Sequence, residues 1–369
     1  MDSHYQAQKT DLSMEMMSRT LWSGLMVGDA LGAPAEFNYH GDVMHRFPDG
    51  LDRMVGGFGI CPDRKAGEVT DDTQMSWCLH QSLLDADGWS PEAAMRRYQE
   101  WIDSDPPDAG YATKMALLGN PLPDAQGNGA LMRVMPLALW AAQHPGFDWQ
   151  TAVREDAALT HPHPVNGECN VVYVYALLLA MQGGMSPQAI YESTLSWAQE
   201  QGIMPEVIET LRRAATERPD YDGEHIGWVH VALHSAFYQL LHARDFRSAL
   251  VDIVSSGGDT DTNAAIAGPL LAAAFGPQSI PSEWLVCVRV ANEPRYAELV
   301  LRRKDLRALG GGIPQGVSRC SVVFEKRSEK PRRVPAAGLS QQLSGIWSWL
   351  LFFCKLQEMI YLKKSFYSC

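Results

Sequence analysis

Two short acidic segments, each leading directly into an apolar helical pattern, constrain the fold of this chain more than any other feature. The first is TDDT at residues 70–73 and the second is DTDT at residues 259–262. Each segment taken alone is typical of a helix start, because Thr and Asp are common N-caps and the positive end of a helix tolerates carboxylates. Capping is therefore the simplest interpretation of each one.

Taken together, the two segments indicate a shared site for cations. Gly257 and Gly258 precede the second segment and free its backbone for a close approach. In an extended stretch, Asp259 and Asp261 would point to the same side. Four buried carboxylates are very costly unless cations neutralise them, and oxygen ligands without nearby Cys or His favour Mg²⁺ or Mn²⁺. We therefore expect two distant parts of the chain to form one oxygen-rich pocket.

The rest of the pattern predicts helices and no regular run of strands. Apolar residues recur at helical spacing over 14–25, and small residues follow at 24, 28, 30 and 32, where another backbone can approach. Ser-Pro pairs at 90–91 and 186–187 predict two helix starts. Residues 171–181 are apolar on all sides, which indicates a buried helix, and an Ala-rich helix over 262–275 ends at a Gly-Pro pair. The chain is therefore expected to be all-α.

Composition divides the chain into one large unit with extensions. With 369 residues, of which 46% are hydrophobic, the chain is long enough for a large core. We expect an N-terminal extension over 1–13, a helical domain over 14–309 and a basic, poorly ordered tail over 310–369. The net charge of −12 for the whole chain and the lack of a basic stripe argue against nucleic-acid binding.

Cysteine usage and hydropathy predict where the protein works. The seven cysteines form no CxxC pair and no signal-peptide pattern opens the chain, so we expect a reduced, cytoplasmic protein. The longest apolar run, over 346–354, is far shorter than the roughly 20 residues of a membrane span. A membrane protein is therefore not expected, and a monomer is the simplest state.

Three further motifs have both an ordinary and a functional interpretation. Glu36, seven residues after Asp29, is either a solvated surface residue or a mobile general base on a loop. Residues 127–129 (GNG) are either a common turn or a loop that opens a helix and binds phosphate through backbone amides. His161, between Thr160 and a proline, is structural by default.

In this order, the motifs resemble those of the ADP-ribosylglycohydrolases. They are GDALG with a Glu seven residues after its Asp, TDDT, GNG followed by Met-Arg, Thr-His, and GGDTDT, and they cover roughly residues 15–305. The resemblance implies a single compact, orthogonal multi-helix domain with two Mg²⁺ or Mn²⁺ ions at the base of a cleft. It implies metal ligands Thr70, Asp71, Asp72, Asp259, Asp261 and Thr262, catalytic roles for Glu36, Asp71 and Asp261, and substrate contacts from Gly127, Asn128, Gly129, His161, Gly257 and Gly258. The family pattern leaves the tail unexplained.

The implied reaction is metal-assisted cleavage of the glycosidic bond of an ADP-ribosyl group on a protein partner, through an oxocarbenium-like transition state. Glu36 or a water on the metal is the better base, because carboxylates bound to cations are poor bases. Arginine-linked ADP-ribose is the favoured substrate, with serine-linked or O-acetyl-ADP-ribose as alternatives. Two further alternatives are a binding or immunity protein that occludes an ADP-ribosylating toxin or transferase, and a two-metal phosphoesterase.

Overall fold

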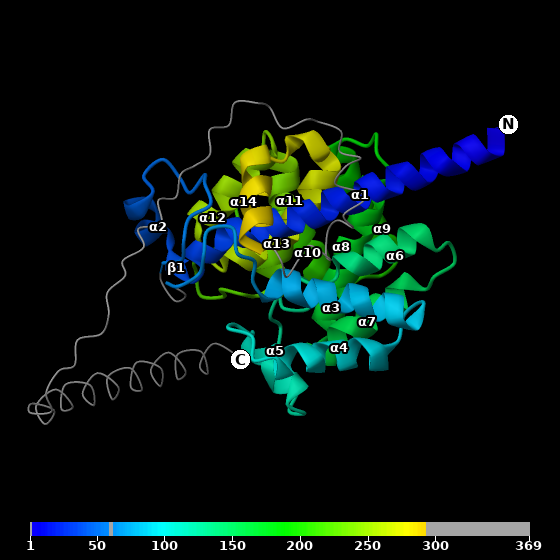
Figure 1. Cartoon of the computed structure of the whole chain (residues 1–369), viewed down its shortest axis with the longest axis horizontal. Coiled ribbons are helices and arrows are strands. Elements are labelled where there is room, and N and C mark those ends of the chain that lie inside the picture. Colours follow the sequence, from blue (N-terminus) through cyan, green and yellow to red (C-terminus); the bar gives the residue numbers. More distant parts are fainter. Residues whose placement is uncertain (1, 59–61, 293–369) are drawn as a thin grey trace, which may run out of the picture. The chain divides into compact units, whose positions relative to one another are not determined.

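Helices follow one another along the chain in the computed structural model, which describes residues 2–58 and 62–292, with side chains from residue 14 (Figure 1). The α-helices are α1 (Asp2–Gly32), α2 (His40–Arg46), α3 (Asp71–Ala86), α4 (Pro91–Asp103), α5 (Tyr111–Leu117), α6 (Met135–Gln143), α7 (Trp149–Thr160), α8 (Pro164–Met181), α9 (Pro187–Glu200), α10 (Pro205–Ala214), α11 (Val229–His242), α12 (Phe246–Ser255), α13 (Thr260–Phe275) and α14 (Ser282–Asn292). Two 3-10 turns, η1 (Ala33–Ala35) and η2 (Pro277–Ser279), and two short strands, β1 (Asn38–Tyr39) and β2 (Gly257–Gly258), complete the described elements. The all-α prediction is confirmed, and the predicted tail over 310–369 lies outside the described residues.

Helix α13 is the centre of the domain. It packs against α1, α8, α11 and α12, and every side chain from Thr260 to Ala272 is buried. A helix that is hydrophobic all round is stable only inside a core, as this one is. Its N-terminus, which carries the second acidic segment, is consequently buried as well.

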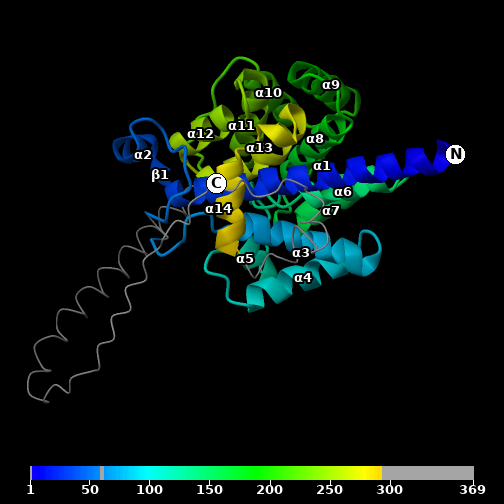
Figure 2. The ribbon, with the colours of Figure 1, turned by 45° about the horizontal axis from the view of Figure 1, so that its top comes forward.

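Glycines allow α1 to lie directly against α13, and both ribbon views show the two helices side by side (Figures 1 and 2). A Cβ on Gly28 would lie 2.1 Å from the carbonyl oxygen of Ala264, and one on Gly24 would lie 2.5 Å from that of Gly268. Contacts this short are impossible for any larger residue. The close backbone approach predicted from the small residues is confirmed, and it brings the end of α1 to the start of α13.

The helix starts expected from the Ser-Pro pairs are also present. Ser90 accepts a hydrogen bond from the Ala93 amide at the start of α4, and Ser186 accepts one from Ala189 at the start of α9. At the other end of α13, Gly276 has a φ of 88°, which only glycine adopts without strain. The local signals in the sequence therefore set these helix ends correctly.

Strands β1 and β2 make a two-residue antiparallel pair that joins the segment after Glu36 to the segment before Asp259. Gly258 has a φ of 78°, and a Cβ there would lie 1.8 Å from the carbonyl oxygen of Tyr221. Glycine is required at this position for both reasons. The pairing fixes Glu36 beside the second acidic segment.

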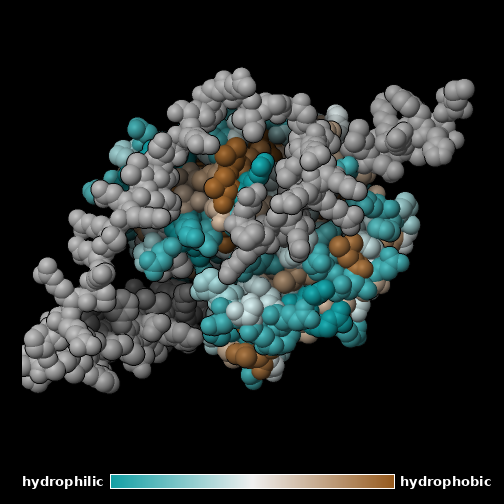
Figure 3. All heavy atoms as spheres, viewed as in Figure 1, coloured by the Kyte–Doolittle hydropathy of each residue, from teal (hydrophilic) through white to brown (hydrophobic). Residues whose placement is uncertain are grey.

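The described surface is mainly polar on the face shown in Figure 3. A hydrophobic patch lies where Figure 1 draws α14, and Val286 and Val290 of that helix are exposed. Among the described helices, none has the length and apolar character that a membrane span requires. Both exposed valines belong to α14, so this patch lies on a single helix.

Candidate metal centre and active site

The first acidic segment is the N-terminus of α3, and its capping is unusual. Thr70 is the N-cap, and its hydroxyl donates to Asp72 Oδ2 at 2.8 Å. Asp29, from α1, accepts hydrogen bonds from the amides of Thr70 at 3.0 Å and Thr73 at 3.1 Å, and from the Thr73 hydroxyl. A carboxylate from another helix therefore satisfies amides that the start of α3 leaves without partners.

The second acidic segment is the N-terminus of α13. Asp259 occupies the N-cap position and Asp261 lies in the first turn, where its Oδ1 accepts from the Thr262 amide at 2.9 Å. The Thr260 hydroxyl donates to the carbonyl of Gly32 at 2.7 Å, which ties this helix start to the end of α1. The stretch is not extended, because the helix already begins at Thr260, and the interpretation of this segment as a helix start agrees with the structure.

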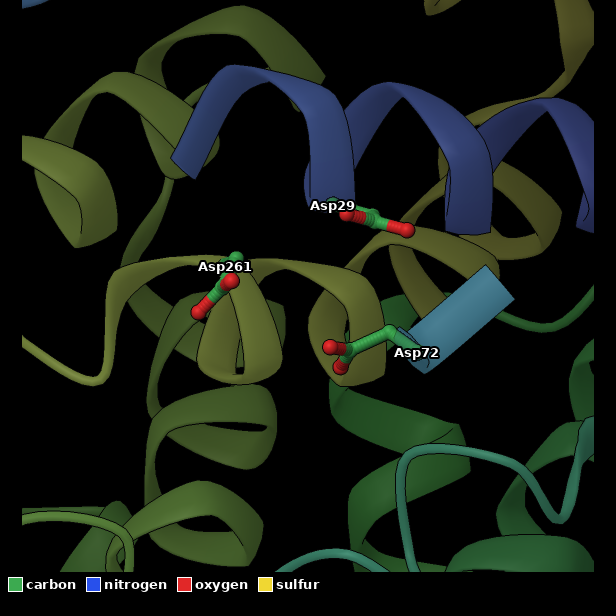
Figure 4. Close-up of side chains that lie close together, drawn as sticks. All are labelled: Asp29, Asp72 and Asp261. Atoms are coloured by element: carbon green, nitrogen blue, oxygen red, sulfur yellow. The ribbon is translucent and has the colours of Figure 1, made fainter. Parts of the chain in front are cut away.

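The two helix starts bring their carboxylates together. Carboxylate oxygens of Asp29, Asp72 and Asp261 lie within 4.8 Å of one another, and so do those of Glu36, Asp259 and Asp261. Figure 4 shows Asp29 from α1, Asp72 from α3 and Asp261 from α13 projecting into the space between these helices. Asp261 belongs to both groups, so the site consists of two carboxylate triads with one shared member.

Buried charge makes this site electrostatically strained without a cation. Burial, together with the neighbouring carboxylates, raises the pKa values of Glu36, Asp72 and Asp261 well above their usual range. Burial and the charge of Asp108 raise the pKa of Asp71 to about 7. These directions indicate that the surrounding protein compensates the negative charge of the carboxylates only in part.

Two oxygen atoms of the site, Glu36 Oε2 and Asp72 Oδ1, are buried without a hydrogen-bond partner among the described residues. A buried acceptor without a partner is costly, and a cation removes that cost. Every atom that the two triads offer to a metal ion is a carboxylate oxygen, the ligand type that hard divalent cations prefer. The residues therefore fit divalent cations.

The predicted metal ligands do not contribute equally. Asp72, Asp259 and Asp261 are members of the triads, whereas Asp71 belongs to neither and accepts from the Gly110 amide at 3.4 Å. Thr70 lies next to Asp72, and Thr262 is buried at the start of α13. That Thr70, Asp71 and Thr262 bind metal remains a prediction.

Glu36 is buried, with 7% of its surface exposed, and it follows η1 directly. The solvated-surface interpretation is therefore wrong. Its carboxylate belongs to the second triad, and the adjacent Phe37 has a φ of 56° and donates its amide to the Gly258 carbonyl at 2.7 Å. Glu36 is thus a candidate ligand as well as a candidate base.

The GNG segment lies opposite the second acidic segment. Asn128 donates through its side-chain amide to Asp259 Oδ2 at 2.8 Å, and its backbone amide donates to the Gly227 carbonyl at 2.9 Å. A Cβ on Gly129 would lie 2.9 Å from Cε1 of His161, so the imidazole packs directly against this turn. The structure brings residues 127–129 and His161 together beside the acidic cluster.

Of the two interpretations of residues 127–129, the structure agrees with the turn and not with a helix start. Residues 128–133 form turns, and α6 begins only at Met135. Gly127 instead forms an isolated antiparallel bridge with Trp228, which commits backbone groups of the loop to another segment. Phosphate binding at a helix N-terminus is therefore not available to this loop.

Four site residues were not assigned a role from the sequence: Asp29, Asp108, Arg133 and Trp228. Asp29 was visible in the GDALG motif, but its role depends on α1 meeting α3. Asp108 forms an ion pair with Arg64 at 3.6 Å, between two loops that carry no motif. Arg133 was visible in the Met-Arg pair after GNG, whereas no local signal marked Trp228.

Comparison with known proteins agrees with this geometry. The sequence profile of the ADP-ribosylglycohydrolase family matches residues 17–313. The ADP-ribosyl-[dinitrogen reductase] glycohydrolase of Rhodospirillum rubrum is 29% identical over 71% of this chain and 86% of its own length. The ADP-ribosylarginine hydrolase Tri1 of Pseudomonas putida is 27% identical over 71% of each chain. A solved structure titled ADP-ribosylglycohydrolase-related protein complex is 31% identical and covers 76% of this chain and 95% of its own, with a TM-score of 0.64.

The chain belongs to the ADP-ribosylglycohydrolase family. It is a hydrolase of glycosidic bonds, the family is metal-dependent, and the carboxylates of the acidic cluster could hold metal ions.

Proposed function

We propose that this protein removes ADP-ribose from arginine side chains of modified proteins, using two divalent cations, Mg²⁺ or Mn²⁺. The observation that carries the proposal is the pair of carboxylate triads sharing Asp261, with buried oxygens of Glu36 and Asp72 that have no partner among the described residues. One ion would be held by Asp29, Asp72 and Asp261, and the other by Glu36, Asp259 and Asp261. Thr70, Asp71 and Thr262 would complete the ligand set.

When bound, the ions neutralise the carboxylates and act as Lewis acids that orient the ribose hydroxyls and the attacking water. The protein supplies the rest. Asn128, fixed by its bond to Asp259, holds the GNG turn where the distal ribose and diphosphate would lie. The anomeric carbon becomes oxocarbenium-like as the bond breaks.

Glu36 would give the second ion one carboxylate oxygen, and its other oxygen is the candidate acceptor for the proton of the attacking water. Burial and the charges of Asp108, Asp259 and Asp71 raise its pKa, so it holds a proton more readily than an exposed glutamate. A base with a raised pKa is matched to proton transfer near neutral pH. Water adds to the anomeric carbon and gives one proton to Glu36, the carbon–nitrogen bond breaks with its electron pair on the nitrogen, and the proton then passes from Glu36 to that nitrogen, which leaves Glu36 ionised again.

The charge of the site favours a cationic leaving group. Six carboxylates gather here, whereas two divalent ions supply four positive charges; the carboxylates are Asp29, Glu36, Asp71, Asp72, Asp259 and Asp261. Asp108 adds a negative charge that Arg64 balances at 3.6 Å. With two ions bound, the site keeps a net negative charge, which attracts the positively charged guanidinium of arginine. A serine or acetyl group carries no positive charge and gains no such attraction.

The test is product release from arginine-linked and serine-linked ADP-ribose proteins, with Mn²⁺, with Mg²⁺ and after chelation. We expect free ADP-ribose from the arginine-linked protein in the presence of metal, and none from an Asp259→Asn/Asp261→Asn variant that keeps its helical circular dichroism. Release from the serine-linked protein alone would overturn the arginine assignment. AMP as the product would indicate a phosphoesterase instead.

The alternative of a binding or immunity protein has its own readout. If the same double variant still protects cells against an arginine-modifying toxin, occlusion of the toxin explains protection and hydrolysis does not. The proposal predicts that protection is lost together with product release.

A further inference from the structure

Behind the GNG turn, an arginine and a carboxylate form an ion pair with no exposure to solvent. Arg133 Nε donates to Asp156 Oδ2 at 3.1 Å, and another guanidinium nitrogen donates to the Asp156 carbonyl at 2.8 Å. Tyr98 donates its hydroxyl to Asp156 Oδ1 at 2.7 Å, and its ring lies 4.5 Å below the guanidinium. Each charged group is fully engaged, so the position of the guanidinium is fixed.

This ion pair extends to His161 through one hydroxyl. The remaining guanidinium nitrogen of Arg133 donates to Thr160 Oγ1 at 2.8 Å, and Thr160 Oγ1 lies 2.8 Å from Nδ1 of His161. Arginine can only donate, so the Thr160 oxygen is an acceptor in the first bond. Its own proton then needs an acceptor, and the acceptor that the described residues offer is His161 Nδ1.

The other end of the imidazole has no protein partner among the described residues. His161 Nε2 would lie 3.3 Å from a Cβ on Gly127 and 3.3 Å from one on Gly129, so it faces the inner side of the GNG turn. Each of the two glycines leaves this nitrogen uncovered. A hydrogen at Nε2 is therefore available to a ligand bound at the GNG turn.

We propose that Arg133 and Thr160 are positioning residues that lock His161 in the neutral tautomer with its proton on Nε2. His161 then acts as a hydrogen-bond donor to an oxygen of the ADP-ribosyl group and not as a base. The identity of the ligand rests on the proposed function, whereas the tautomer rests on the hydrogen bonds alone.

The surroundings of the ring favour the neutral form. Burial and the nearby Arg133 lower the pKa of His161 to about 3, so the imidazole stays uncharged at physiological pH. A neutral donor beside several carboxylates binds an oxygen of the substrate without pairing with the acidic groups that hold the ions. The hydrogen bonds from Arg133 through Thr160 end at His161, whose Nε2 can donate to the ligand.

The direct test is nitrogen NMR of the full-length protein labelled with ¹⁵N-histidine, without ligand at neutral pH. The chain has eleven histidines, and a His161→Gln variant identifies the signals of interest. We expect a protonated Nε2 and an unprotonated, hydrogen-bonded Nδ1 for His161. A protonated Nδ1 in the wild-type protein overturns the proposal.

Variants at Thr160 test the positioning role. Thr160→Val removes the donor, so a population protonated at Nδ1 should appear, and KM for the ADP-ribosylated substrate should rise roughly tenfold with kcat nearly unchanged. Thr160→Ser should restore both properties. Thr194→Val is the matched control, because Thr194 is equally buried and its hydroxyl donates only to a backbone carbonyl of α9.

The outcomes separate the two proposals. If Thr160→Val keeps the wild-type nitrogen spectrum and KM, Thr160 does not set the tautomer and this inference is wrong. If the tautomer is as expected but no substrate releases ADP-ribose, the proposed function fails and the inference about His161 stands.

Discussion

Asp261 is shared by both carboxylate triads, so its replacement should weaken the binding of both cations and reduce the stabilisation that they give. Asp261→Asn keeps the size of the side chain and deletes one ligand charge from each triad. A ligand that binds only the folded state stabilises it by about 2.7 kcal/mol at 100 times its Kd. Two such ions contribute about 5 kcal/mol, which raises the Tm of a domain of this size by roughly 10–20 °C.

The assay is thermal unfolding with and without Mn²⁺, at a concentration that saturates the wild-type protein. Wild type should show the full shift and Asp261→Asn less than half of it. Without metal, the variant should be at least as stable as wild type, because a buried charge of raised pKa has been removed. Asp49→Asn, at an exposed position, is the control and should keep the full shift. A full metal-dependent shift in Asp261→Asn would refute the shared-ligand arrangement.

Three further predictions concern the frame, the electrostatics and the substrate contact. Gly28→Ala should destabilise the protein by at least about 3 kcal/mol, because the new methyl group overlaps a backbone carbonyl of α13, whereas Gly41→Ala in α2 meets no atom within 4 Å and should be neutral or slightly stabilising in chemical denaturation. Burial raises the pKa of Asp71 to about 7 in the folded protein, so between about pH 4 and 7 the folded state binds more protons than the unfolded state. The free energy of unfolding without metal should therefore fall as the pH rises from about 4 to 7. In urea titrations, an Asp71→Asn variant should show a smaller fall. Asn128→Asp places a carboxylate against Asp259 and should raise the KM for ADP-ribosylated substrate at least tenfold in initial-rate assays, while Asn128→Ser should have a smaller effect.

The sequence predicted the helical frame well because its signals are local. Ser90 and Ser186 cap helices whatever surrounds them, and Gly28 is informative because no other residue permits so close an approach. The two acidic segments were predicted both as helix starts and as parts of one site. The structure shows that these interpretations are compatible, since the carboxylates lie at two buried helix starts.

The remaining features depend on contacts between distant segments. Asp29 is 41 residues from Thr70, and only the packing of α1 beside α3 makes it an acceptor for amides at the start of that helix. Glu36 looks like a surface residue until β1 pairs with β2 and buries it. The GNG segment could not be distinguished from a helix start, because its pairing partner, Trp228, is a hundred residues away.

If two cations share Asp261, anomalous scattering from a crystal grown with Mn²⁺ should show both of them. We expect two anomalous peaks, one among Asp29, Asp72 and Asp261 and the other among Glu36, Asp259 and Asp261. A single peak, or peaks that do not contact Asp261, would contradict it.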